Sequence, residues 1–293
     1  MFLNFNNELD KRISSLFSQE VIESITPENL DFLGMNLSFY DDDISFKTYY
    51  LHEYSLACYN NQEDNEPLIK FLKSKDMLNF FSVLKDSAYK DTEIYEVKIS
   101  ARNNRNMLEL FSFLEQLISY FSKYKDEIIK LSTIKNRAYE GYDYAALYFF
   151  SVVKKGADIK SFKCYWDNNY KILDDDYFFN FLENSGVTGL QELIPIAKSI
   201  VQNCGGHLCF EGINYNEKCS EKHKIYMTDQ NNLIEGLIKT FPDMEFLHKK
   251  LRLIEEWQKV HPEFYCDIFA IGKDSKGRLI LNLYFRFIED EFD

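Results

Sequence analysis

The sequence predicts an α+β fold: a ten-stranded antiparallel β-barrel ringed by helices and built from five helix-helix-strand-strand repeats. Short runs of alternating apolar residues occur in pairs around a polar turn, which is typical of β-hairpins. These pairs recur with a period near 58 residues. Apolar residues at helical spacing lie between them. An internal repeat of this size is typical of folds that close or stack their units.

Four hairpins are predicted directly from strand alternation. Their ranges are 33–51, 146–166, 207–227 and 267–287. The second strand of each hairpin contains Lys or Asn, then any residue, then Tyr. The four pairs are Lys47 and Tyr49, Lys163 and Tyr165, Lys224 and Tyr226, and Asn282 and Tyr284. The recurrence of one pattern in four strands predicts that these side chains share one surface.

A fifth hairpin is expected near residue 105, because Lys47 and Lys163 are two periods apart. The range 94–111 offers an alternating run, a polar turn and then the residues MLELF, which place Glu109 at the position of the Lys-x-Tyr pattern. An alternative reading of the same residues is a continuous amphipathic helix that begins at Asn106. With the hairpin, five units use the whole chain.

Helices are predicted between the hairpins from apolar residues at helical spacing. The clearest ranges are 66–90, 114–134, 190–203 and 232–260. The last of these places Leu247, Leu251, Ile254 and Trp257 on one face. That face is expected to pack inward from an outer helix.

The lumen of a ten-stranded barrel is too wide for its own side chains to fill, so the predicted barrel holds a ligand. Strand alternation places Phe46 and Thr48 on one face and Lys47 and Tyr49 on the other. The outer helices need the more apolar face, so the lysines are expected to point into the lumen. Cations that meet there repel one another unless a polyanion lies among them.

This arrangement resembles the ABBA, or PT-barrel, prenyltransferases. The resemblance covers nearly the whole chain as architecture, and the build is most similar to the bacterial aromatic and cyanobactin peptide branches. It implies a soluble enzyme that moves a dimethylallyl or geranyl group from its diphosphate to an electron-rich aromatic acceptor. The acceptors implied are indole or Trp, phenol or Tyr, or such a side chain in a peptide, as in cyanobactin maturation.

The resemblance also implies a role for each group of residues. The cations that hold the diphosphate and stabilise its developing charge would be Lys47, Lys163, Lys222, Lys224 and Arg286. The rings that shield the allylic cation would be Tyr49, Tyr165, Tyr226 and Tyr284. A barrel glutamate would accept the proton that the acceptor loses. The candidates are Glu211, Glu96 and Glu109, and strand-face parity alone does not separate the first two.

The chain departs from the family pattern at two places. The second unit lacks the Lys-x-Tyr pair, and the fifth has Asn282 where the others have a cation. The D-D-x-x-D motif of the all-helical prenyltransferases is also missing, and the five histidines show no metal-ligand spacing. The sequence therefore requires no cofactor and no protein-held metal, and Mg²⁺ is expected only through the diphosphate.

Composition excludes several other classes. A formal net charge of −13 argues against a nucleic-acid partner. No apolar run approaches the ~20 residues of a membrane helix, and there is no signal peptide. Six cysteines without a C-x-x-C pair predict reduced thiols in the cytoplasm. With 45% apolar residues, the chain can form one large domain or two small ones. The resemblance implies a single prenyltransferase-barrel domain over 1–293.

The sequence is also compatible with two other kinds of protein. In the first, the barrel carries an anionic or lipid-like ligand and catalyses no reaction, which the missing Lys-x-Tyr pair in unit two and Asn282 in unit five favour. In the second, the repeat is an accident, and the chain is an unrelated α+β interaction protein.

Overall fold

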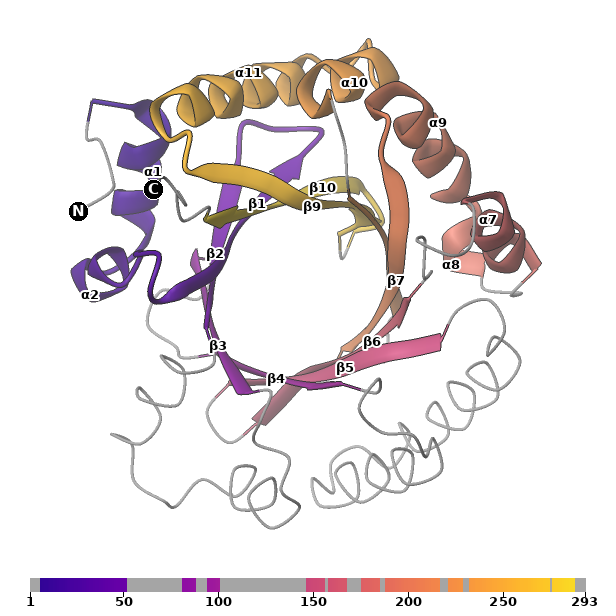
Figure 1. Ribbon diagram of the computed structural model, residues 1–293, viewed down its shortest axis with the longest axis horizontal. Helices are drawn as coiled ribbons and strands as arrows, with labels where there is room; N and C mark the ends of the chain where they lie inside the picture. Colours follow the sequence, from indigo (N-terminus) through magenta and orange to yellow (C-terminus); the bar gives the residue numbers. More distant parts are fainter. Residues whose placement is uncertain are drawn as a thin grey trace, which may run out of the picture.

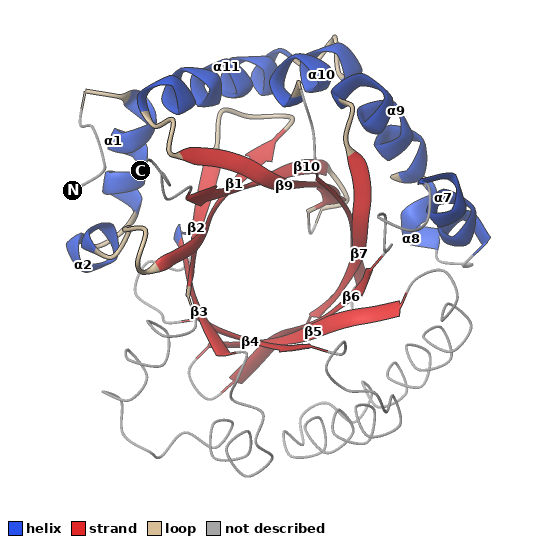
Figure 2. Ribbon diagram, in the orientation of Figure 1, coloured by secondary structure: helices blue, strands red, loops and turns tan. Residues whose placement is uncertain are grey.

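A computed structural model describes residues 6–51, 81–87, 94–100, 146–155, 158–167, 175–184, 188–216, 221–228, 232–274 and 276–287. The described strands pair antiparallel and form a closed barrel in the order β1-β10-β9-β8-β7-β6-β5-β4-β3-β2. The described helices lie around the outside of the barrel (Figure 1, Figure 2). The predicted combination of helices with an antiparallel sheet is therefore confirmed.

The strands are β1 (Leu30–Ser38), β2 (Ile44–Tyr50), β3 (Phe81–Asp86), β4 (Ile94–Ser100), β5 (Ala146–Lys155), β6 (Asp158–Asp167), β7 (His207–Asn216), β8 (Glu221–Thr228), β9 (Phe264–Lys273) and β10 (Leu279–Phe287). The described helices are α1 (Glu8–Leu16), α2 (Gln19–Glu23), α7 (Asp175–Asn184), α8 (Thr188–Gln191), α9 (Ile194–Cys204), α10 (Leu233–Thr240) and α11 (Glu245–Val260). Within the described part of the chain, no helix is long and apolar enough to cross a bilayer.

The four hairpins predicted from alternation are present as β1–β2, β5–β6, β7–β8 and β9–β10. The helices predicted over 190–203 and 232–260 are also present. The second is divided into α10 and α11 at Pro242, because proline has no N–H to donate and its ring clashes with the preceding turn. The helix predicted over 114–134 lies outside the described residues.

The second hairpin differs from the prediction. β4 is its second strand rather than its first, and β3 is its first strand. β3 falls within 66–90, where apolar spacing predicted a helix. Six residues are too few for hydrophobic periodicity alone to distinguish a helix from a strand. Pairing with β2 on one side and with β4 on the other stabilises the strand conformation. Glu109 and Asn106 lie in 101–145, outside the described residues.

The main hydrophobic core lies between the barrel and the helices. Leu247, Leu251, Ile254 and Trp257 of α11 are fully buried, as predicted. They belong to the same core as alternate residues of the strands, among them Ile225, Met227, Leu281, Leu283 and Phe285. Burying each large aliphatic or aromatic side chain contributes roughly 1.5–3 kcal/mol. On the strands that contribute to it, this core fixes the outer face, so the residues between its members face the lumen.

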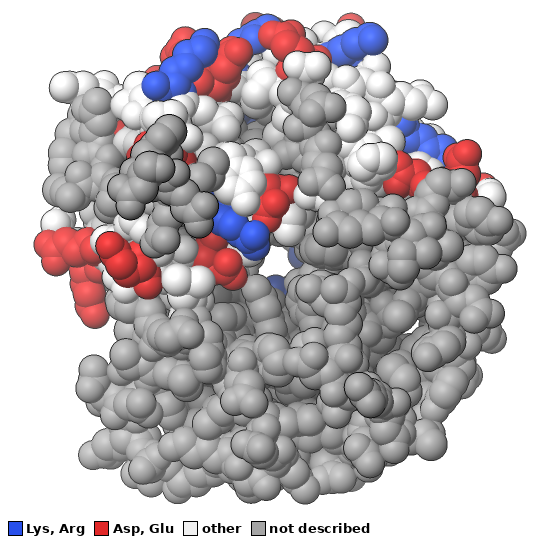
Figure 3. All heavy atoms as spheres, viewed as in Figure 1, with Lys and Arg blue, Asp and Glu red and all other residues white. Residues whose placement is uncertain are grey.

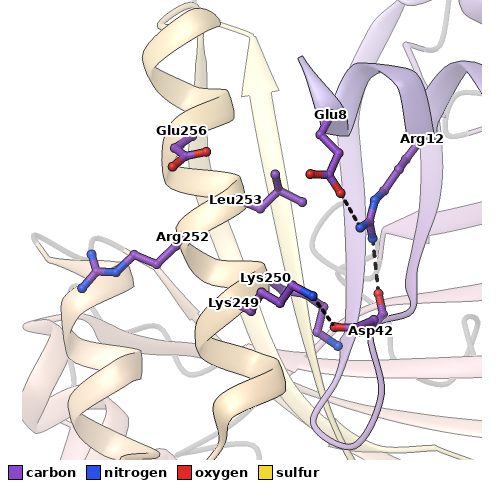
Figure 4. A pocket seen from close by; sticks show the side chains of 8 residues that line it. All are labelled: Glu8, Arg12, Asp42, Lys249, Lys250, Arg252, Leu253 and Glu256. Atoms are coloured by element: carbon purple, nitrogen blue, oxygen red, sulfur yellow. Dashed lines mark hydrogen bonds and ion pairs between the residues drawn. The ribbon is translucent and has the colours of Figure 1, made fainter. Parts of the chain in front are cut away.

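A buried lysine ties α11 to the turn between β1 and β2. The Lys250 ammonium donates to the carbonyl oxygens of Ser38, Asp41 and Asp43. Beside it lies a cavity of about 240 Å³ lined by charged side chains of α1, α11 and the turn (Figure 4). There Arg12 donates to the Glu8 carboxylate at 2.6 Å and to the Asp42 carbonyl at 3.3 Å. These contacts give Asp41, Asp42 and Asp43 of the turn a structural role.

A second buried network ties α1 to α11 and β9. The Asp10 carboxylate accepts hydrogen bonds from Trp257 Nε1 and His261 Nε2, both at 2.8 Å. His261 Nδ1 lies 3.1 Å from the Glu263 carboxylate. Burial lowers the pKa of His261, but Asp10 and Glu263 more than offset this, so that pKa lies above its usual value. Charged His261 therefore stabilises the fold.

The stabilisation from His261 should depend on pH. It is fully present below the unfolded-state pKa of about 6.5 and is lost as pH rises through the higher folded-state pKa. We expect His261→Gln to lower the melting temperature more at pH 6 than at pH 9, measured by calorimetry. The matched control is His207→Gln, which changes an exposed histidine. A deficit in His261→Gln that does not shrink between these pH values would contradict this assignment.

Candidate functional site

The inner face of the barrel gathers lysines from three strands. Lys47 lies on β2, Lys163 on β6, and Lys222 and Lys224 on β8, and all four are partly buried. Burial lowers the pKa of Lys222, Asp274 partly offsets that effect, and the charge of Lys47 lowers the pKa further. The repulsion between Lys47 and Lys222 shows that cations from β2 and β8 approach one another. Viewed down the barrel, basic atoms lie at and inside the central hollow (Figure 3).

Four tyrosine rings form a continuous arc next to the lysines. Ring centroids are separated by 6.0 Å between Tyr49 and Tyr284, 6.1 Å between Tyr284 and Tyr226, and 5.8 Å between Tyr226 and Tyr165. Each tyrosine follows a lysine or Asn282 by two residues, which is about 7 Å along a strand. The lumen thus has a layer of cations beside a layer of aromatic rings.

These surroundings favour the neutral form of the Tyr226 and Tyr284 hydroxyls. Burial raises the pKa of Tyr284 to about 12, with Tyr165 adding to this and Lys47 and Lys163 opposing it. Burial also raises the pKa of Tyr226, and the neighbouring tyrosines raise it further. The hydroxyls of Tyr226 and Tyr284 are hydrogen-bonded to each other. Neutral phenols can donate hydrogen bonds to an anion without adding negative charge to the site.

Small residues on the intervening strands leave room for the arc. The sequence prediction missed them, although their strands were assigned correctly. The rows in register are Tyr284, Gly34 and Lys47; Tyr226, Ala270 and Asn282; and Tyr165, Gly212 and Lys224. The order of tyrosine, small residue, then lysine or asparagine recurs in all three rows. Neighbouring hairpins are therefore paired with the same register offset in each row.

Asp86 is an inner-face residue that the sequence prediction also missed. It lies opposite Lys47 in register, and its buried carboxylate is 2.9 Å from Lys47 Nζ. The sequence offers one indication of this strand, the alternate positions of Ser82, Leu84 and Asp86. It was overlooked because these residues lie within the helix predicted over 66–90. β3 is five strands from β8 in the closed order, so Asp86 lies on the wall opposite Lys222 and Lys224.

The register of the strands distinguishes Glu96 from Glu211, which the alternation within a single strand could not do. Glu96 is opposite Ser82 in register. Ser82 and Asp86 are four residues apart on β3, so their positions share one face of that strand, and Asp86 is opposite Lys47 on the inner face. Glu96 therefore holds an inner-face position. Glu211 is opposite Ile225, a fully buried member of the outer core, and so holds an outer-face position. The geometry favours Glu96.

Arg286 does not join the lysines. It lies two residues beyond Tyr284 on β10, on the side of the arc away from Asn282, and its side chain is exposed. Its guanidinium is 3.3 Å from Asp267 and 4.0 Å from Asp31, and it lies 4.5 Å from the ring of Phe32. Two carboxylates already compensate this cation, so it is the weakest of the predicted diphosphate contacts.

Asn282 occupies the lysine position on β10. It is 1% exposed, and neither its amide nitrogen nor its amide oxygen has a hydrogen-bond partner among the residues that the structure describes. Its neighbour in register, Asn36, donates instead to the hydroxyl of Ser45 at 3.1 Å. Buried polar groups without partners are rare and costly. Asn282 is therefore a candidate ligand contact on the inner face.

Several solved structures share this fold. NotF prenyltransferase aligns with a TM-score of 0.65 and 9% identity, over 88% of this chain and 80% of that one. AnaPT from Neosartorya fischeri aligns with a TM-score of 0.61 and 10% identity, over 88% and 78%. 5-Dimethylallyltryptophan synthase from Streptomyces coelicolor aligns with a TM-score of 0.57 and 7% identity, over 89% and 81%. Neither a family signature nor a characterised relative matches the sequence itself. Identities this low show the fold alone.

Replacing Asn282 tests whether its carboxamide is unsatisfied. Asn282→Leu removes two unpaired polar atoms at similar volume, so we expect the free energy of unfolding in urea to rise by about 1 kcal/mol. Asn36→Leu is the matched control, and it should lower that free energy because Ser45 loses its partner. A clear loss of stability in Asn282→Leu would show that the carboxamide is satisfied within the fold, which contradicts a ligand role.

Proposed function

We propose that this chain is a prenyltransferase that moves a dimethylallyl or geranyl group from its diphosphate to an electron-rich aromatic acceptor. The proposal includes five helix-helix-strand-strand units that form one PT-barrel domain over 1–293. The observation that carries it is the layered lumen, in which lysines of β2, β6 and β8 lie beside an arc of four tyrosine rings. Two solved relatives in fold support this kind of ligand: NotF in complex with brevianamide F and DMSPP, and PriB with product diphosphate.

The layers match the two charges that form when the donor ionises. The bond between the allylic carbon and the diphosphate oxygen breaks, and its electron pair leaves with the diphosphate. The ammonium groups of Lys163, Lys222 and Lys224 stabilise that developing anion. The allylic cation, one bond away from the leaving oxygen, then lies against the tyrosine faces. A cation over an aromatic ring gains about 2 kcal/mol or more when water is excluded.

The acceptor is expected on the β3–β4 side of the lumen. The tyrosine arc comes from β2, β10, β8 and β6 and leaves out β4. The acceptor ring would attack the cation from that side and then lose a proton, and we assign Glu96 as the proton acceptor because its inner-face position in register supports that role. Asp86 holds Lys47 by their ion pair. Indole, phenol and the corresponding peptide side chains all meet this requirement, since each has an electron-rich ring and a proton to lose.

The remaining parts of the proposal concern metals and location. No residue in this scheme needs a protein-held metal, so Mg²⁺ would enter only with the diphosphate it neutralises. The cysteine pattern predicts a cytoplasmic protein. Both stay predictions.

The lysines should control donor binding. We expect dimethylallyl S-thiolodiphosphate, in which sulfur stands in for the reactive bridging oxygen, to raise the melting temperature in the presence of EDTA. Lys163→Ala and Lys224→Ala should abolish the rise, because each removes a charge that contacts the diphosphate. Lys198→Ala is the control: this lysine lies on α9 and pairs with Glu183 at 2.6 Å. If no allylic diphosphate shifts the wild-type protein, the proposal fails.

Turnover distinguishes an enzyme from a carrier and Glu96 from Glu211. Mass spectrometry with dimethylallyl or geranyl diphosphate and a mixture of indole, phenol and peptide acceptors should detect a prenylated product, which a carrier cannot form. Glu96→Gln should lower kcat by about 10²-fold or more, since it removes a proton acceptor. Glu211→Gln should leave kcat within about twofold. The reverse order of effects would show that the register argument assigns the wrong glutamate.

A further inference from the structure

Two glycines lie directly beneath side chains of the proposed site. A Cβ at Gly272 would lie 2.7 Å from Cγ of Lys224, and a Cβ at Gly34 would lie 3.3 Å from the ring of Tyr49 and 3.5 Å from Cβ of Lys47. The stem of Lys224 therefore lies flat across β9, and the Tyr49 ring lies against β1. A methyl group at Gly272 would overlap the Lys224 stem, and one at Gly34 would press on the Tyr49 ring.

Backbone conformation does not explain these glycines. The described glycines with positive φ are Gly205 and Gly277, both outside the strands. Gly34 and Gly272 lie in strands without a positive φ, where glycine is less stable than alanine. Glycine inside a strand often marks a place where another group approaches the backbone closely. Here the approaching groups are a lysine stem and a tyrosine ring of the neighbouring strands.

The register shows that the arrangement is repeated. Lys224 lies between Gly212 and Gly272, and Lys47 lies opposite Gly34. A lysine beside glycine can fold its stem onto the sheet instead of extending across the lumen. The ammonium group then stays near the wall, and the centre of the barrel is left for the ligand.

We propose that Gly34 and Gly272 are positioning residues, which hold Tyr49 and Lys224 back against the barrel wall. Gly272 sets where the Lys224 ammonium meets the diphosphate, and Gly34 sets how far the Tyr49 ring extends over the prenyl chain. The inference rests on the proposed function, because it gives both side chains the roles assigned there. It adds that the width of the lumen is set by residues that contact no substrate.

A methyl group at Gly272 would clash with its neighbours. Its 2.7 Å separation from Lys224 Cγ is shorter than real carbon contacts, and the His223 carbonyl oxygen lies 3.1 Å away on the other side. The backbone of β8 is held by its ladders with β7 and β9, so the Lys224 stem must move. We expect the Kd of Gly272→Ala for inorganic diphosphate, measured by titration calorimetry, to rise by about tenfold or more, as expected from displacing a charged contact.

A double-mutant cycle separates positioning from general damage. If Gly272 acts through Lys224, the Gly272→Ala change should have little further effect on Kd in a Lys224→Ala background. Gly189→Ala is the matched control. Its Cβ would lie 2.2 Å from the ring of His223, on the outer face of the same strand. It should lower the melting temperature and leave Kd for diphosphate unchanged.

Gly34→Ala provides a second variant if Gly272→Ala does not fold, since its contacts of 3.3 and 3.5 Å are milder. Its Tyr49 ring should move inward and weaken the binding of geranyl S-thiolodiphosphate more than that of the dimethylallyl analogue. Equal changes for the two analogues would overturn the role of Gly34.

The outcomes separate the inference from the function on which it rests. Wild-type binding of diphosphate with an unchanged Kd in Gly272→Ala overturns the inference and leaves the proposed function standing. Equal losses from Gly272→Ala in the wild-type and Lys224→Ala backgrounds also overturn it, because the effect would not pass through Lys224. If the wild-type protein does not bind diphosphate, both the proposed function and the inference fall.

Discussion

The alternation of side chains across a closed sheet is the constraint on which the rest of the structure depends. Closure removes the sheet edges, and the described helices cover the outside, so the outer face must supply an apolar surface such as Ile225 and Met227. The residues that alternate with them face the lumen, so they do not need to be apolar. Lys224 and Tyr226 can therefore face inward from a strand whose other face is fully committed to packing.

That separation allows the fold to keep an unfavourable group of residues in the lumen. Burial and the charge of Lys47 lower the pKa of Lys222, and Asn282 is buried without a hydrogen-bond partner in the described part of the chain. Gly272 in a strand interior adds a backbone cost. None of these features improves the unliganded protein. They become favourable when an anion with several oxygen acceptors lies among them, which is the relation expected where function is maintained at the expense of stability.

The sequence predicted the parts that depend on period and missed those that depend on register. Local alternation predicted hairpins such as 146–166, and helical spacing predicted the buried face of α11. The inward direction of Lys47 followed from the apolar residues that alternate with it along the strand. β3 was missed because six residues carry too little periodicity, and with it Asp86 was missed. Parity within one strand could not separate Glu96 from Glu211, since that requires knowing which residue lies opposite each. The small residues beneath the arc were visible in the sequence, but their meaning depends on the same cross-strand register.

The proposed function requires the lysine layer to hold the diphosphate of an allylic donor. A crystal structure with dimethylallyl S-thiolodiphosphate tests it most directly, because sulfur in place of the bridging oxygen prevents departure of the diphosphate. In that structure we expect phosphate oxygens within hydrogen-bond distance of Lys163 Nζ and Lys224 Nζ, with the allyl group against the rings of Tyr226 and Tyr284. A diphosphate bound outside the lumen, or an allyl group directed away from the arc, would contradict it.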